Sequence, residues 1–128
     1  MERGEFEAYM TAYNENDLER IFSWYAPDVI FENFGGYQKG EDVFTFLRQL
    51  HDVVSSTFTI RQLLIDGDHV AMEADCEIEA KIDLPHLPAG PMRAGEKNVC
   101  RIFGFYKTEG NKIVHIKVAG WPPVPVER

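Results

Sequence analysis

"VAMEADCEIEA", residues 70–80, is the stretch that decides the expected fold. Every second residue from Val70 to Ile78 is apolar or small, and the intervening positions from Glu73 to Glu79 are all acidic. Successive side chains of a β-strand point to opposite faces of its sheet. The stretch therefore predicts a strand with one buried face and one face that meets water or a partner.

Neighbouring stretches continue the two-residue period. Gly67-Asp68, Glu109-Gly110-Asn111 and a long loop rich in Pro and Gly separate them, as turns separate the strands of a meander. We predict a curved antiparallel sheet from the strands 58–65, 70–82, 98–107 and 112–121.

The period alone does not settle which face of strand 98–107 is inside. Arg101, Phe103 and Phe105 share one face, and Cys100 and Tyr106 belong to the other. A charge amid apolar neighbours needs a carboxylate, a dimer partner or an anionic ligand. For Arg101, a cross-strand ion pair with one of the acidic residues of 73–77 is the alternative to a ligand-binding role.

The N-terminal half has helical periodicity. Apolar residues recur every three to four positions over 5–15, 18–25 and 41–54, which predicts three amphipathic helices, and 29–34 predicts a strand between the second and third. Helices followed by a meandering sheet indicate an α+β fold in which the helices cover one face. At 128 residues we expect one domain, 1–128.

Composition excludes several functions. The net charge of −8 and the pI near 4.9 leave no basic stripe for a phosphate backbone, so we expect no nucleic-acid partner. The start, MERGEFEAYM, has no positively charged leader before an apolar stretch, and no segment approaches the ~20 apolar residues that span a bilayer. We expect a cytoplasmic protein without a membrane partner.

The two cysteines, Cys76 and Cys100, belong to separate predicted strands. They form neither a CxxC pair nor a Cys/His cluster with metal-ligand spacing. We therefore expect buried free thiols and no metal site, with a disulfide as the alternative.

An amide poses the main functional question. Asn33 follows the apolar residues 29–31, where a strand side chain can face the interior, and a buried amide needs a hydrogen-bond partner. One candidate is a ligand. The alternative is a strand-end turn formed with the glycines behind it.

Three segments together resemble a known family. "AYNENDLERIFSWYAPDVIFEN" (12–33), "GGYQKGEDVFTFLRQL" (35–50) and the stretch 82–121 are similar, in this order, to the SnoaL-like polyketide cyclases of the nuclear transport factor 2-like superfamily. The resemblance implies a cone of curved antiparallel sheet covered by three N-terminal helices, with a pocket between them. It also implies a homodimer formed through the β-sheet.

The resemblance extends to ketosteroid isomerases, in which a first-helix tyrosine donates to the substrate carbonyl. Tyr9 occupies a similar position, but the carboxylate base of the first strand falls on Asn33, and an amide cannot act as a general base. A base must then come from elsewhere, and His51, His86 and Asp83 are the candidates. A histidine is the favoured one.

We therefore expect a pocket for a small hydrophobic molecule that carries a carbonyl or hydroxyl group. Tyr9, Asn33 and His51 are the predicted catalytic residues, with Asn33 bonding a ligand or Tyr9 and no cofactor taking part. The predicted substrate-binding residues are Tyr13, Tyr25, Phe31, Tyr37, Arg101, Phe103, Phe105 and Trp121.

Two functions remain open at this stage. The first is a cofactor-independent cyclase, isomerase or dehydratase that acts by acid/base catalysis. The second is a noncatalytic dimeric module that uses the sheet for binding or scaffolding. An interior with converging titratable groups favours the enzyme.

Overall fold

The computed structural model describes residues 1–33, 36–87 and 90–120. The helices found in these ranges are α1 (Arg3–Asn14), α2 (Leu18–Ser23) and α3 (Glu41–Val53). The strands found there are β1 (Tyr25–Asn33), β2 (Gly36–Lys39), β3 (Val54–Asp66), β4 (His69–Ala80), β5 (Lys97–Glu109) and β6 (Lys112–Gly120).

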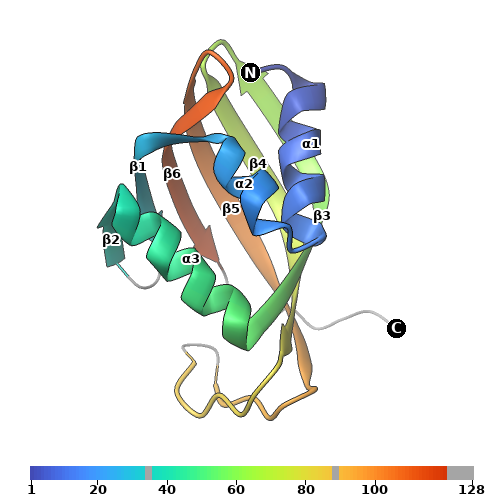
Figure 1. Ribbon diagram of the computed structural model, residues 1–128. Helices are drawn as coiled ribbons and strands as arrows, with labels where there is room; N and C mark the ends of the chain where they lie inside the picture. Colours follow the sequence, from blue (N-terminus) through green and yellow to red (C-terminus); the bar gives the residue numbers. More distant parts are fainter. Residues whose placement is uncertain (34–35, 88–89, 121–128) are drawn as a thin grey trace.

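All the strands join one sheet in the order β2-β1-β6-β5-β4-β3. The sheet curves around the helices, which all lie on one of its faces (Figure 1). This arrangement confirms the predicted α+β cone with three N-terminal helices. One pair, β1 with β6, is parallel, so the sheet is mixed rather than purely antiparallel. We call the face covered by the helices the inner face and the opposite one the outer face.

Short turns set the register of the second half. Asp66 pairs with His69 and Glu109 with Lys112, so two residues connect each hairpin. Gly67 and Gly110 adopt φ of 60° and 62°, a left-handed conformation that suits tight hairpin turns and that glycine adopts without steric penalty. Both turn predictions are confirmed.

Three predicted boundaries differ from the structure because strand pairing outweighs local sequence. β1 begins at Tyr25 rather than Val29 and includes Pro27. The pairing of β1 with β6 is irregular between Tyr25 and Ile30, so the strand tolerates a proline, which has no N–H to donate. Residues 36–39, which the sequence did not predict as a strand, form β2 against β1. β3 begins at Val54, directly after α3, because its first residues pair with the end of β4.

The core lies between the helices and the inner face. Each helix contributes a fully buried side chain, namely Phe6, Ile21 and Leu47, and β6 contributes Ile113 and Ile116. On β4 the alternate residues from Val70 to Cys76 are buried as the sequence predicted.

Gly104 allows an aromatic ring to lie against β5. A Cβ at this position would come within 2.8 Å of Cε1 of Tyr106, so the ring occupies the space that a side chain would need. The side chain of Tyr106 is thereby held on the inner face.

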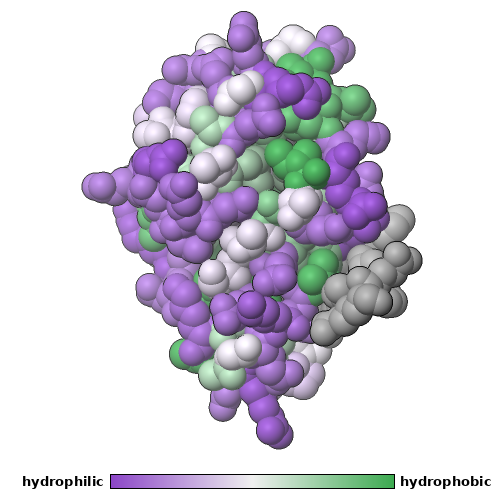
Figure 2. Space-filling model, turned by 90° about the vertical axis from the view of Figure 1, so that its right-hand side faces the viewer, coloured by the Kyte–Doolittle hydropathy of each residue, from purple (hydrophilic) through white to green (hydrophobic). Residues whose placement is uncertain are grey.

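The surface is mixed in polarity. On the side that carries α1 and β3, separate apolar patches lie among hydrophilic residues (Figure 2). Among the helices in the described ranges, none combines the length and the apolar character needed to cross a bilayer.

Candidate functional site

Four tyrosines gather on the inner face of the sheet. Tyr9 and Tyr13 come from α1, Tyr25 from β1 and Tyr106 from β5, and all are buried. The ring centroid of Tyr9 lies 5.8 Å from that of Tyr25 and 6.2 Å from those of Tyr13 and Tyr106. The sequence predicted the first three as site residues and missed Tyr106. The alternation of strand 98–107 could have indicated it, because it places Tyr106 on the face opposite to Arg101, Phe103 and Phe105.

The hydroxyl groups of Tyr9 and Tyr25 form a hydrogen bond of 2.7 Å. Burial raises the pKa of both hydroxyls well above the ordinary value, and their mutual proximity contributes further to that of Tyr9. Both groups therefore stay protonated near neutral pH. One proton is used in their mutual bond, and the second can be donated to another acceptor.

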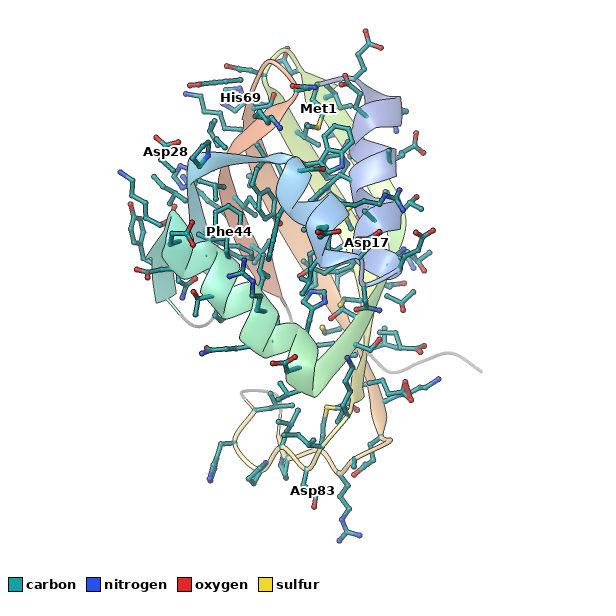
Figure 3. The ribbon with its side chains drawn as sticks, viewed as in Figure 1. Met1, Asp17, Asp28, Phe44, His69 and Asp83 are labelled. Carbon is teal, nitrogen blue, oxygen red and sulfur yellow. The ribbon has the colours of Figure 1, made fainter. Side chains whose placement is uncertain are left out.

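Helices α2 and α3 cover the pair of tyrosines. The Phe44 side chain extends from α3 into the space between the helices and the sheet (Figure 3). Its ring centroid lies 4.8 Å from that of Phe22 on α2 and 6.2 Å from that of Tyr25. The guanidinium of Arg48 lies over Phe22 at 5.2 Å from the ring centroid. The Tyr25 hydroxyl is thus held in a largely apolar environment.

His51, in the last turn of α3, is the second polar feature of the inner face. Its side chain is buried, and its ring centroid lies 5.3 Å from that of Tyr13 in an edge-on contact. Within the described part of the chain, neither ring nitrogen has a hydrogen-bond partner. Buried polar atoms are nearly always paired, so these two nitrogens point to a missing partner.

The surroundings of His51 favour its neutral form. Burial lowers the pKa of His51 below its ordinary value, and the positive charge of Lys81 lowers it further, against a smaller opposing effect of Asp52. Lys81 is held close because its Nζ donates to the backbone carbonyl of His51 at 2.6 Å. A neutral imidazole offers one N–H donor and one nitrogen that can accept a proton.

Apolar side chains surround His51 and Tyr13. The ring centroid of Phe58 on β3 lies 5.2 Å from that of Tyr13. Phe46 on α3 contacts Phe31 on β1 with ring centroids 6.0 Å apart. Phe46 and Phe58 are only partly buried although they pack against the core. An apolar surface therefore extends from the tyrosines along this end of the inner face.

Asn33 has a different partner from those expected. Its Nδ2 donates to Oε1 of Gln38 on β2 at 2.7 Å, whereas the Tyr9 hydroxyl bonds Tyr25. The expectation of an Asn33–Tyr9 bond is therefore wrong. The register pairs Asn33 with Gly36, so the amide stabilises the end of the β1–β2 hairpin, close to the strand-end role that the sequence left as an alternative.

Arg101, Phe103 and Phe105 lie on the outer face, so the expectation that they line the interior is wrong. The alternation of β5 places Ile102 and Tyr106 inside and these three side chains outside. Arg101 donates from Nε to Asp75 at 2.7 Å and from Nη1 to Glu73 at 3.2 Å. The cross-strand ion pair is thus the arrangement that the structure shows.

The remaining predicted residues divide between the two faces. Phe31 is buried on the inner face, as expected. Tyr37 pairs with Glu32 across the β1–β2 ladder and is 61% exposed, so it does not line the interior. Trp121 lies outside the described residues.

A groove of about 260 Å³ crosses the outer face. Glu32 and Asn33 from β1, Phe103 and Phe105 from β5, and residues 117–119 of β6 line it. Phe105 is 64% exposed there, and nearby His115 bonds Glu32 at 2.6 Å. The inner and outer surfaces are separate candidates for binding.

A metal centre is not evident in residues 1–33, 36–87 and 90–120. In these ranges no three His, Cys, Asp or Glu side chains converge in a way that could hold an ion.

A model of a protein family, described as the SnoaL-like domain, matches residues 6–116. A search of curated proteins finds no match.

Three solved structures show the same fold. A candidate polyketide cyclase from Pseudomonas putida KT2440 is 20% identical, with a TM-score of 0.75 over 90% of this chain and 87% of that chain. An LEH-like epoxide hydrolase from Mycobacterium tuberculosis is 17% identical, with a TM-score of 0.73 over 91% and 80%. TerC, co-crystallized with polyporic acid, is 17% identical, with a TM-score of 0.71 over 91% and 88%. At these identities the likeness establishes the fold alone.

Proposed function

Because the chain belongs to the SnoaL-like domain family, we propose that it binds a small, largely apolar molecule on its inner face and acts on it by acid/base chemistry. The molecule carries a carbonyl or hydroxyl group. His51 is the base, and the Tyr9–Tyr25 pair is the hydrogen-bond donor. Isomerisation, cyclisation and dehydration all begin with the removal of a proton next to a carbonyl, and all fit this pair of roles.

One observation carries the proposal: His51 is buried with both ring nitrogens unpartnered in the described part of the chain. Leaving a buried polar group unpaired costs about 1–3 kcal/mol, which an ordinary core position would avoid with an apolar residue. A ligand that accepts from one nitrogen, or yields a proton to the other, removes this penalty.

The two parts of the site have complementary chemistry. A neutral His51 accepts a proton from a carbon beside a carbonyl, a step in which a positioned base contributes roughly 10²–10⁴-fold. The negative charge that then develops on the carbonyl oxygen needs a donor. The Tyr9–Tyr25 pair has one proton to offer, in an apolar environment where such a bond is strong.

The aromatic surroundings favour a ring-containing ligand. The Tyr13 ring lies next to His51, and the Phe58 ring packs against Tyr13. The structural neighbour TerC was co-crystallized with polyporic acid, which supports a small organic molecule as the ligand in our proposal. Asn33 has no role in our proposal, because its amide is engaged with Gln38.

Imidazole NMR tests the proposal. A panel of phenols and aromatic 1,3-diketones is titrated into protein with ¹⁵N-labelled histidine. We expect at least one compound to shift the His51 ring signals in a saturable manner. His51→Gln and Tyr25→Phe should each weaken its binding by about tenfold, the loss of one hydrogen bond to a buried group.

His86 provides the matched control, because it is exposed in the loop after β4. His86→Gln should leave affinity unchanged. Compounds that bind without moving the His51 signals, or that bind His51→Gln as tightly as the wild type, would contradict the inner-face site. Saturable binding without turnover of any bound compound would favour the noncatalytic module.

We further propose that the chain forms a homodimer through the outer face. Two large hydrophobic side chains, Phe105 and Leu64, are 64% and 62% exposed on this face. A dimer partner would remove their apolar surface from water. The Arg101, Glu73 and Asp75 side chains add paired charges beside them. An apolar centre with a charged rim is typical of a protein–protein interface.

A further inference from the structure

Cys76 and Cys100 are directly opposite each other on adjacent strands. The antiparallel register of β4 and β5 pairs the two residues, so their side chains share the inner face. Both are free thiols, and Cys100 Sγ donates to the Cys76 carbonyl at 3.8 Å. Directly opposed residues have Cβ atoms about 4.5–5.5 Å apart. A disulfide needs roughly 3.5–4.5 Å, so a small approach of the two strands is enough to allow the bond.

The two thiols have different environments. Cys76 is buried at 3% exposure, whereas Cys100 is only partly buried. The neighbouring Cys76 thiol lowers the pKa of Cys100 to about 7, and the Cys100 thiol together with burial raises the pKa of Cys76. A partly exposed thiol with a lowered pKa beside a second thiol is the arrangement found in cysteines that respond to oxidants.

We propose that Cys76 and Cys100 form a site of reversible oxidation, in which a peroxide converts the thiol pair into an intramolecular disulfide between β4 and β5. Cys100 is the residue that reacts with the oxidant, and Cys76 is the residue that resolves the product. The proposal does not depend on the ligand or on the chemistry of the inner-face site.

The reaction balances in two steps. The Cys100 thiolate attacks one oxygen of the peroxide, the O–O bond breaks, and hydrogen peroxide yields a sulfenic acid and hydroxide, which is released as water. The Cys76 sulfur then attacks the Cys100 sulfur and displaces its hydroxyl group, which leaves as water with the Cys76 proton. The two thiols are oxidised to one disulfide, and hydrogen peroxide is reduced to two water molecules.

Intact-mass analysis with hydrogen peroxide tests the proposal on the full chain. We expect the wild type to lose the mass of two hydrogen atoms, to lose both thiols in a thiol assay, and to regain them with dithiothreitol. Non-reducing electrophoresis should show no covalent dimer. The first step should accelerate as pH rises through about 7, where Cys100 ionises.

Two serine variants separate the roles of the cysteines. Cys76→Ser should stop at a sulfenic acid that dimedone traps on Cys100. Cys100→Ser should react about tenfold more slowly at pH 7, because Cys76 has little thiolate at that pH. Cys76→Ala replaces Cys76→Ser if the serine variant shows an altered circular dichroism spectrum.

Three results would overturn the proposal. They are a folded wild type that gains oxygen without forming a disulfide, a disulfide that links two chains, and equal oxidation rates in the two serine variants.

Discussion

The environment of His51 in the structure differs from the one that its position near a helix end suggests. Near the end of a helix, a charged histidine would interact favourably with the helix dipole, and the sequence alone favours this interpretation. Burial and the neighbouring Lys81 instead favour the neutral ring. The side chain also points toward Tyr13 rather than toward solvent. These features of its environment depend on α1 and on Lys81, which follows β4, and the helix sequence does not describe them.

The lowered pKa of His51 predicts a pH effect on stability. Below about pH 6.5, the unfolded chain takes up a proton at this residue before the folded chain does. The free energy of unfolding should therefore fall as pH decreases from 6.5 toward the folded-state pKa. His51→Leu lacks this component, so its urea midpoint should change less between pH 7.5 and 5.5 than that of the wild type.

His86→Leu is the comparison for that experiment, because this histidine is exposed in the loop after β4. At pH 7.5, His51→Leu should be at least as stable as the wild type, since the substitution removes a polar group without a partner. Superimposable pH profiles of wild type and His51→Leu would contradict a lowered pKa in the folded state.

At the scale of elements, α1 is fastened to the edge of the sheet. Asn14 Nδ2 donates to the Phe58 carbonyl at 2.9 Å, and the Phe58 N–H donates to Asn14 Oδ1 at 2.7 Å. At the other end of the helix, Arg3 Nη2 donates to the Leu63 carbonyl at 2.9 Å. β3 is the last strand of the sheet, so these side chains satisfy backbone groups that have no further strand to pair with.

Removal of the Asn14 amide should loosen this edge. We expect Asn14→Ala to lower the free energy of unfolding by about 1–3 kcal/mol, because the partly buried Phe58 backbone groups lose their partners. Hydrogen exchange at the Phe58 amide should become faster. Thr11→Ala on the same helix, which removes an exposed bond to the Glu7 carbonyl, should have little effect. Equal losses in the two variants would show that the Asn14 contacts add nothing.

At the scale of elements, the sequence predicted the helices, turns and strands correctly where the local hydrophobic period matches the element that the fold requires. The three helices, the β3–β4 and β5–β6 turns and the alternation of β4 are all present. β2 was missed because its four residues, which begin with Gly36, are too few to show a strand period of their own. They become a strand only through pairing with β1.

At the scale of the whole molecule, the proposed homodimer places the outer face between two copies of the chain. If the proposed homodimer buries Phe105 at its centre, Phe105→Glu should place a charge in the interface and shift the protein to a monomer in light scattering coupled to gel filtration. A stable interface of this kind covers about 800 Å² on each partner.

Asn111→Glu supplies the control for the dimer, because it adds the same charge in the exposed turn between β5 and β6. This variant should keep the mass of the wild type. A wild-type protein that is monomeric at all concentrations, or a Phe105→Glu variant that keeps the dimeric mass, would contradict the outer-face dimer.

The sequence by itself determined the α+β class, the family and the inner position of Tyr9, Tyr13, Tyr25 and Phe31, since each follows from a local period or from motifs in a given order. Only the tertiary structure decided which face of β5 is inside. When a strand has apolar residues on both faces, its own sequence does not decide which face is buried. The ion pairs of Arg101 with Glu73 and Asp75 on β4 hold Arg101 on the outer face. Phe103 and Phe105 lie on the same face because side chains alternate along β5. Hydrogen-bond partners, such as Gln38 for Asn33, likewise depend on distances that no sequence pattern states.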